Sequence, residues 1–229
     1  MSASDSPDTL AAVMAEHGIE LPADRIAALE RYCALVWEWN TRLNLTRHTD
    51  YQKFVTRDLV DSLAFSRFLA PGERVLDVGT GGGVPGVVLA ILRPDLSIAL
   101  CESVGKRARA VGDVVAQLGL STPVHESRAE DLLTRMRFQT LVVRAVARLH
   151  RLLEWLRPCW DHFDRMLVLK GPAWVEERGE ARHLGLLNGL ALRKLDSYPL
   201  IGTESESVLL QICPKERLGP EDSCALTAL

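Results

Sequence analysis

A run of glycines that directly follows an apolar segment places the strongest constraint on the fold of this chain. The segment is Val75–Val78, and the next eight residues, 79–86, include five glycines and one proline. Glycines let the backbone turn sharply and approach a ligand closely, and proline is favoured in the first turn of a helix. The pattern predicts a buried strand, a tight turn and a helix that begins near Pro85. The free N–H groups at the beginning of such a helix make the turn a candidate ligand site.

Short apolar runs alternate with helical patterns after this turn. Strands are predicted over 74–78, 97–101, 123–126, 140–144 and 166–170, and helices over 87–92, 106–118, 149–155 and 173–188. Two further strands, 190–195 and 207–213, are expected to form an antiparallel pair. This alternation is typical of βαβ units. It predicts an α/β, Rossmann-like fold with a mostly parallel sheet and an antiparallel final strand.

The first 70 residues have a helical pattern instead. Apolar residues recur at three- and four-residue steps from Ile26 to Trp37, and a second helix is predicted over 52–68, before Pro71-Gly72. The expected organisation is an N-terminal helical extension (1–70), a ligand-binding domain (71–216) and a flexible tail (217–229).

Composition narrows the class of protein. The chain is 47% hydrophobic and 25% charged, which is ordinary for a globular protein. It has no apolar run of the roughly 18 residues that a membrane helix needs, so no membrane partner is expected. Its five cysteines are scattered, without zinc-site spacing, so no metal is expected. With no secretory signal at the first residues, we expect a cytoplasmic protein, and a monomer.

Two ligand classes use a glycine-rich turn of this kind, dinucleotides and S-adenosylmethionine (SAM). The dinucleotide fingerprint G-x-G-x-x-G fits when it starts at Gly81 but not at Gly79. The glycines alone therefore do not decide between a dinucleotide and SAM. Asp77 favours SAM, because Asp77–Gly83 matches D-x-G-x-G-x-G, the pattern of class I SAM-dependent methyltransferases. Glu102 ends the second predicted strand, where a carboxylate accepts hydrogen bonds from ribose hydroxyls of either ligand. SAM is the expected cofactor, with Asp77, Gly79, Gly81 and Glu102 among the residues that bind it.

The residues that follow the fourth predicted strand face the transferred methyl group in this fold. Enzymes that methylate exocyclic amines carry N/D-P-P-Y/F there, whereas this chain has Val-Arg-Ala-Val-Ala at 143–147, which disfavours an amine substrate. Methylation of pyrimidine carbon 5 needs a cysteine nucleophile. Cys159 follows a proline, but it lies well past Arg144 in sequence, and we expect it to be a packed structural cysteine.

A basic run surrounds the end of the fourth predicted strand. Residues 135–157 contain six arginines and one acid, although the whole chain has a net charge of −3. Since arginines bind RNA phosphates, this run is interpreted as part of an RNA-facing rim. Arg144 is the first choice for a catalytic residue, in the sense of a residue that positions the reactants. Lys170, at the end of the fifth predicted strand, is the second.

Several motifs, in order and at matching spacing, resemble the RsmG (GidB) family of 16S rRNA guanine-N7 methyltransferases. The motifs are Asn44–Thr46, Arg57 with Asp61-Ser62, 77–86, Lys106-Arg107, Arg128–Glu130, Arg144–Ala147 and Leu169–Gly171. The resemblance implies a SAM-binding domain with a helical N-terminal portion and a substrate in the small ribosomal subunit, N7 of the guanine at position 527 of 16S rRNA. It also implies SAM contacts at Gly79, Val84, Ala129, Glu130 and Arg144.

Three positions depart from the usual pattern of that family. Asp58 stands where histidine is common, Val143 where serine is common, and Ser207 where arginine is common. Two alternative functions remain open, a SAM-dependent methyltransferase of another substrate and a non-catalytic RNA-binding protein on the same fold. The second is disfavoured because Asp77, the glycines and Glu102 are all present.

Overall fold

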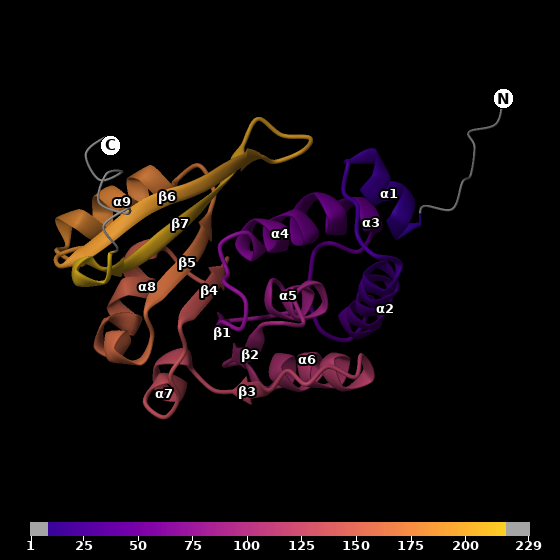
Figure 1. Cartoon of the computed structure of the whole chain (residues 1–229), viewed down its shortest axis with the longest axis horizontal. Helices are drawn as coiled ribbons and strands as arrows, with labels where there is room; N and C mark the ends of the chain where they lie inside the picture. The colour runs from indigo at the N-terminus through magenta and orange to yellow at the C-terminus, as the bar shows by residue number, and fades with distance from the viewer. Residues whose placement is uncertain (1–8, 219–229) are drawn as a thin grey trace.

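Among residues 9–218, seven strands form one sheet in the order β3-β2-β1-β4-β5-β7-β6. The computed structural model describes residues 9–218, and Figure 1 shows the sheet with helices on both sides. The strands are β1 (Arg74–Val78), β2 (Ser97–Glu102), β3 (Val124–Glu126), β4 (Thr140–Arg144), β5 (Arg165–Lys170), β6 (Leu190–Pro199) and β7 (Glu206–Pro214). Neighbours from β3 to β5 pair in parallel, and β7 is antiparallel to both β5 and β6. The predicted Rossmann-like sheet with an antiparallel final strand is confirmed.

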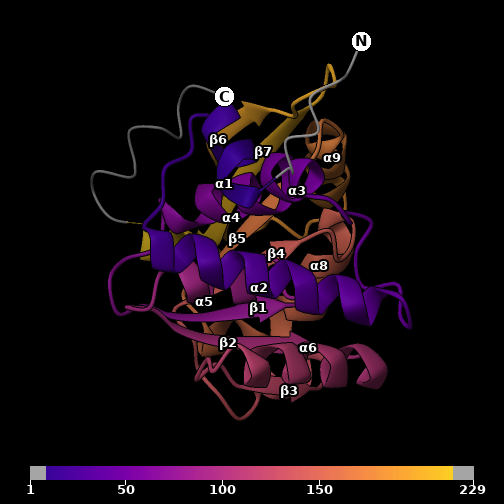
Figure 2. The same ribbon diagram turned by 90° about the vertical axis from the view of Figure 1, so that its right-hand side faces the viewer.

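The helices fall into an N-terminal group and a group that connects the strands. The first group is α1 (Leu10–Glu16), α2 (Ala23–Asn40), α3 (Tyr51–Lys53), the π-helical segment η1 (Phe54–Leu59) and α4 (Val60–Ser66). The second is α5 (Gly86–Leu92), α6 (Gly105–Gln117), α7 (Ala129–Leu133), α8 (Leu149–Leu156), α9 (Trp174–His183) and the 3₁₀ turns η2 (Arg157–His162) and η3 (Lys215–Arg217). Figure 2 shows α2 in front of α5 and β1, and α2 contacts both α5 and α6.

Alternate residues of the central strands enter two separate hydrophobic cores. Val75 of β1 packs into one core with side chains of α1–α6, whereas its neighbour Leu76 packs into the other with side chains of α7–α9. This period of two is expected for a strand that is covered on both faces. The N-terminal helices share the first core with the sheet, because buried Leu29 and Phe65 belong to the same cluster as Val75. The domain division at residue 70 stays a prediction.

The structure differs from the predicted elements in the second half of the chain. The helix predicted over 173–188 ends at His183, since Gly185 adopts a left-handed conformation (φ 70°) and the chain turns into β6. The two last strands are longer than predicted, and their hairpin extends toward α4 in Figure 1. Arg57 Nη2, of η1, donates to the carbonyl of Ile201 in this hairpin (3.4 Å).

The structure describes only the first two residues of the predicted tail, 217 and 218. Arg217 belongs to η3 and donates hydrogen bonds to the carbonyls of Trp160 and Phe163, so it is part of the folded domain. The remainder of the predicted tail, 219–229, lies outside the described residues. Within residues 9–218, no helix has both the length and the apolar character to cross a membrane.

Candidate active site

The glycine-rich turn connects β1 to α5, and at two of its positions only glycine fits. Gly79 has a φ of 69°, and a Cβ there would lie 2.8 Å from Val146 Cγ2. A Cβ on Gly86 would collide with Leu100 and lie 2.6 Å from Asp77 Oδ2. The turn therefore packs closely against the loop that follows β4 and against β2, where a larger residue has no room.

Asp77 stabilises this turn by accepting hydrogen bonds from it. Its Oδ2 accepts hydrogen bonds from the Thr80 hydroxyl (2.6 Å) and the Gly86 N–H (2.8 Å), and the side chain is almost completely buried. Burial raises the pKa of Asp77 to about 6, although both hydrogen bonds act to lower it. Asp77, predicted to contact the cofactor, lies outside the walls of the two cavities described below and shapes the turn itself.

Glu102 lies at the carboxyl end of β2, beside the turn. Its Oε2 accepts from the Gly81 N–H (3.1 Å) and its Oε1 from the Val104 N–H (2.8 Å). Each carboxylate oxygen keeps a second lone pair, so Glu102 is able to accept hydroxyl donors as well. Ala129 and Glu130 begin α7 at the same edge of the sheet, after β3. These three predicted residues do not line the cavities.

The first cavity lies between the turn and the N-terminal helices. Its volume of about 460 Å³ is in the range of small-molecule sites. Gly79, Gly81, Val84 and Arg144 from the predicted site all line it. The Tyr32 hydroxyl of α2 donates to the Gly82 carbonyl (2.9 Å) and so joins the two sides. The glycine backbone, the nearby Glu102 carboxylate and this volume fit SAM.

A second cavity of about 440 Å³ adjoins the first. Lys170, Ser207 and Arg57 line it, and it shares His48, Arg144 and Ala145 with the first cavity. Ala145 has a φ of 55°, the only left-handed conformation of a non-glycine residue among residues 9–218. Such strained positions cluster at functional sites. Two ligands are therefore able to meet at the loop after β4.

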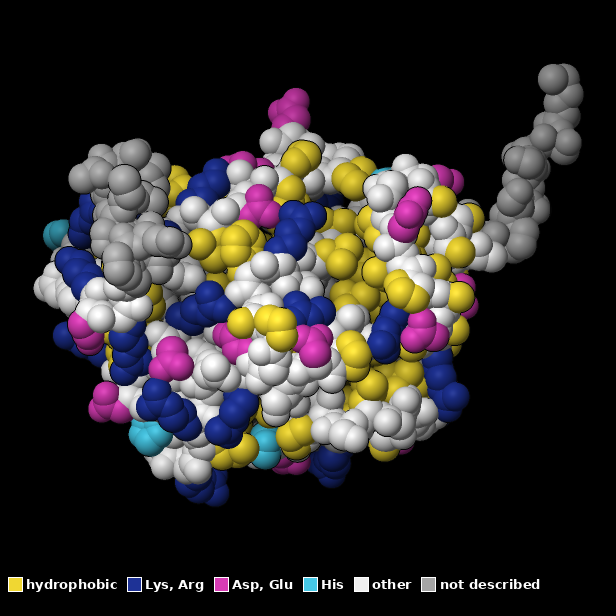
Figure 3. Space-filling view, viewed as in Figure 1, with side chains coloured by type: hydrophobic (Ala, Val, Ile, Leu, Met, Phe, Trp, Pro, Cys, Tyr) yellow, Lys and Arg dark blue, Asp and Glu magenta, His cyan; other side chains and the backbone are white. Residues whose placement is uncertain are grey.

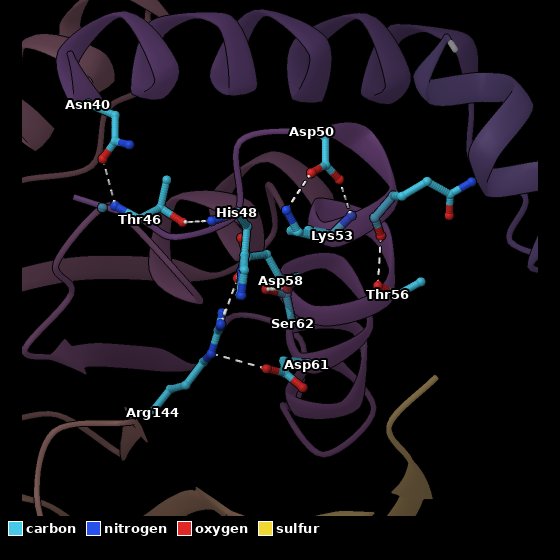
Figure 4. Close-up of polar contacts among 12 residues, drawn as sticks. Asn40, Thr46, His48, Asp50, Lys53, Thr56, Asp58, Asp61, Ser62 and Arg144 are labelled. Carbon is cyan, nitrogen blue, oxygen red and sulfur yellow. Dashed lines mark hydrogen bonds and ion pairs between the residues drawn. The ribbon is translucent and has the colours of Figure 1, made fainter. Parts of the chain in front are cut away.

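Arg144 is bound by two carboxylates from the N-terminal helices, as Figure 4 shows. Its Nη2 lies 2.6 Å from Asp58 Oδ1 and its Nε lies 3.0 Å from Asp61 Oδ2. Burial alone lowers the pKa of the Arg144 guanidinium, but the two carboxylates outweigh it and the pKa is raised. Burial also raises the pKa of Asp61, despite Arg144 and the hydrogen bond from the Tyr198 hydroxyl (2.6 Å). Arg144 is thus a buried, paired cation.

Lys170 is paired as well. Its Nζ lies 2.7 Å from Glu177 Oε2 and donates to the Ala147 carbonyl (2.6 Å). The side chain therefore fastens the loop after β4 to α9. The structure brings Arg144 and Lys170 to one cavity, but each already has carboxylate partners.

The basic run does not lie at one edge of the sheet, because it passes along β4 from one end of that strand to the other. That part of it faces RNA stays a prediction. Arg135 and Arg137 precede β4 at the opposite edge, and Arg137 Nη2 bonds Asp164 Oδ1 (2.7 Å). Arg148 does line the second cavity, but it pairs with Glu176 and Glu180. Figure 3 shows Lys and Arg side chains scattered among acidic and apolar ones on the face it displays.

The three departures from the family pattern have different surroundings. Val143 is buried in the core and does not reach either cavity, and Ser207 lines the second one. Asp58 accepts from Arg144 and contacts His48 Nδ1 (2.9 Å). Sequence reasoning missed His48 entirely. It noted Asp58 and Asp61 without a role, although their three-residue spacing places both on one side of a helix.

Two further predictions concern cysteines and metals. Cys159 is buried at 5% exposure in η2, and its Sγ lies 3.8 Å from the Glu130 carbonyl, which confirms a packed structural cysteine. In the described part of the chain, no three His, Cys, Asp or Glu side chains are grouped so that they could hold a metal ion.

The family and the relatives that match this sequence share one description. Residues 25–197 match the family GidB, described as rRNA small subunit methyltransferase G. A ribosomal RNA small subunit methyltransferase G of Rhodopirellula baltica is 51% identical over 185 residues, 81% of this chain and 80% of that protein. The protein of the same name from Chromobacterium violaceum is 32% identical over 201 residues, 87% of this chain and 93% of that protein.

Solved structures support the fold. A mutant of MtNAS in complex with S-adenosylmethionine has a TM-score of 0.54 at 20% identity, with 82% of this chain and 72% of that chain covered. M. capricolum TrmK in complex with S-adenosyl-homocysteine has a TM-score of 0.54 at 11% identity, with 67% of each chain covered. At these identities the likeness concerns the fold alone, which is that of class I SAM-dependent methyltransferases.

Proposed function

The chain belongs to the GidB family of rRNA small subunit methyltransferases G, and on that premise we propose that it transfers a methyl group from SAM to N7 of a guanine in 16S rRNA. The position expected from the family is 527. The observation that supports this function most directly is the pair of adjoining cavities, one over the glycine turn and one beside it, which share Arg144 and Ala145. A cofactor in the first and a base in the second would meet at the loop after β4.

The cofactor contacts follow from the first cavity and the sheet edge beside it. We assign Gly79, Gly81 and Val84 to the wall against the methionine portion, and Glu102 to the ribose hydroxyls. Ala129 and Glu130, at the beginning of α7, are assigned to the adenine edge. Bound SAM supplies a methyl group on a positively charged sulfur, an electrophile that a lone pair attacks directly.

Guanine N7 has a lone pair and no proton, so the reaction needs no general base. The N7–carbon bond forms as the sulfur–carbon bond breaks, and the electron pair of the broken bond stays on sulfur. Catalysis then consists of holding N7 in line with the methyl group. Arg144 and Lys170 are suited to that work as positioning residues, because their ion pairs fix both ends of the loop 145–147.

The RNA strand requires cations that are not already paired. Arg47 and Arg107 line the first cavity, and neither forms an ion pair with any residue between 9 and 218. We assign them to phosphates of the substrate, which would make binding weaken with salt as counterions are released.

The experiment is incubation of the protein with methyl-labelled SAM and, separately, small subunits that lack the modification, free 16S rRNA and large subunits. The expected result is label in 16S rRNA, none in large-subunit RNA, and inhibition by S-adenosylhomocysteine. Label that enters only a small molecule, or none in any RNA, would reject the proposal.

A further inference from the structure

Of the described residues, three line both cavities, and only one of them is able to offer a hydrogen-bond acceptor to a base. Arg144 has donors only: its Nη2 and Nε pair with Asp58 and Asp61, and its Nη1 has no partner within residues 9–218. Ala145 has no polar side-chain atom. The third is His48, in the loop between α2 and α3. A base whose N7 faces the first cavity from the second would lie against this imidazole.

His48 is held in place at several points. Its N–H donates to the Thr46 hydroxyl (2.9 Å), and its carbonyl accepts from Trp37 Nε1 (2.8 Å). The imidazole Nδ1 lies 2.9 Å from Asp58 Oδ1, and a quarter of the side chain is exposed. A ring fixed in this way is pre-organised, so it binds a ligand without loss of its own conformational freedom.

The partner of Nδ1 determines what the other ring nitrogen offers. Asp58 Oδ1 accepts from Arg144 Nη2 as well, so the carboxylate is an acceptor and Nδ1 is the donor. In the neutral ring Nε2 then carries the lone pair. Nε2 forms no hydrogen bond with any other described residue. The neutral form of His48 therefore presents a fixed hydrogen-bond acceptor where the two cavities meet.

We propose that His48 Nε2 accepts a hydrogen bond from the N1–H or the 2-amino group of the target guanine, and so makes the enzyme selective for guanine. The inference rests on the proposed function. Guanine and adenine both have an N7 lone pair, so the chemistry alone does not distinguish them. The N1–H and the 2-amino group belong to guanine, whereas N1 of adenine is itself an acceptor. A site built to bond a substrate N–H rejects an analogue that lacks it.

The test is a double-mutant cycle in which changes of the His48 side chain are combined with changes of the target base. Wild type, His48→Leu and His48→Gln are assayed on 16S rRNA with guanosine, inosine or 1-methylguanosine at the target position. Inosine lacks the 2-amino group, and 1-methylguanosine lacks the N1–H. For guanosine RNA, kcat/KM of His48→Leu should fall by about 10- to 100-fold, since a donor of the base loses its acceptor. His48→Gln keeps an acceptor and should recover most of that loss.

The deciding result is the coupling. Wild type should lose activity with one of the two analogues, and this loss should disappear in His48→Leu, which no longer makes the contact. His17, at the end of α1, bonds Gln52 and lines neither cavity, so His17→Leu is the matched control and should behave as wild type. The affinity of His17→Leu for S-adenosylhomocysteine should equal that of wild type. If each analogue lowers the activity of His48→Leu as much as it lowers that of wild type, the inference is overturned. A wild type that methylates no RNA would instead reject the proposed function.

Discussion

Arg144 Nη2 and Asp58 Oδ1 are 2.6 Å apart, and both side chains are largely shielded from water, at 16% and 6% exposure. Asp58 belongs to η1 and Arg144 ends β4, so this ion pair joins the N-terminal helices to the sheet edge where both cavities open. Asp61 reinforces it from the next helical turn. The contact places a helical segment that lies outside the Rossmann-like unit in the wall of the candidate site.

Removal of this guanidinium should destabilise the protein as well as stop methyl transfer. Arg144→Ala leaves two buried carboxylates without their partner, which costs about 3–5 kcal/mol of the free energy of unfolding. Arg151→Ala breaks an exposed pair with Glu154 and should cost less than about 1 kcal/mol. Urea denaturation measures both. Equal stability of the two variants would show that Arg144 is not part of a structural ion pair.

Alanine should have opposite effects on stability at Gly86, in the glycine-rich turn, and at Gly112, in α6. Gly86→Ala brings a methyl group against Leu100 and Asp77, and should lower the free energy of unfolding by about 1–3 kcal/mol. Gly112→Ala lies inside α6 with nothing within 4 Å, and should raise it by about 0.5–1 kcal/mol. Thermal unfolding of the two variants tests this. Stabilisation by Gly86→Ala would contradict the close packing of the turn.

Glu102 should contribute to cofactor binding through its charge. Glu102→Gln replaces a carboxylate that accepts charge-assisted hydrogen bonds, so the affinity for S-adenosylhomocysteine should fall by about 10- to 100-fold. Glu154→Gln, on the surface of α8, is the control. Isothermal titration calorimetry with S-adenosylhomocysteine and with NAD gives the measurement. Tight NAD binding, or an unchanged S-adenosylhomocysteine affinity in Glu102→Gln, would refute this assignment.

Asp77 should give stability a distinct pH dependence. Burial raises its pKa from the ordinary value of 3.8 to about 6 in the folded protein. Between these values the folded chain binds more protons than the unfolded chain, so this group adds stability as the pH falls through about 6. Its unfavourable contribution at neutral pH is about 3 kcal/mol. Asp77→Asn lacks this titration, and wild type should therefore gain stability relative to the variant between about pH 7.5 and 5. A difference that stays constant over this range would contradict the raised pKa.

The sheet was predictable because its signals are local. The apolar run Val75–Val78, followed by glycines, forms β1 and its turn, and the strand predicted at 140–144 is observed with the same bounds. The π-helical η1 was not predicted, since Phe54–Leu59 has the same apolar spacing as an ordinary helix. The end of α9 was misplaced because the left-handed turn at Gly185 has only a weak sequence signal.

The site was less predictable because its decisive contacts join distant parts of the chain. Asp58 and Arg144 are 86 residues apart, and no local pattern reports that they meet. The basic run misled for the opposite reason. Arg137 and Arg144 are close in sequence but lie at opposite ends of β4, so the local charge excess is divided between the two ends of this strand. The resemblance to the family indicated which residues matter, but not that Arg144 and Lys170 are paired.

The most direct test of the central claim is the chemical identity of the methylated atom. 16S rRNA recovered from small subunits after incubation with the protein and SAM is reduced with borohydride, cleaved with aniline and mapped by primer extension. N7-methylguanosine becomes labile under this treatment, so the account predicts SAM-dependent cleavage at one guanine, absent with S-adenosylhomocysteine alone. Methyl label incorporated into 16S rRNA without any cleavage at a guanine would contradict it.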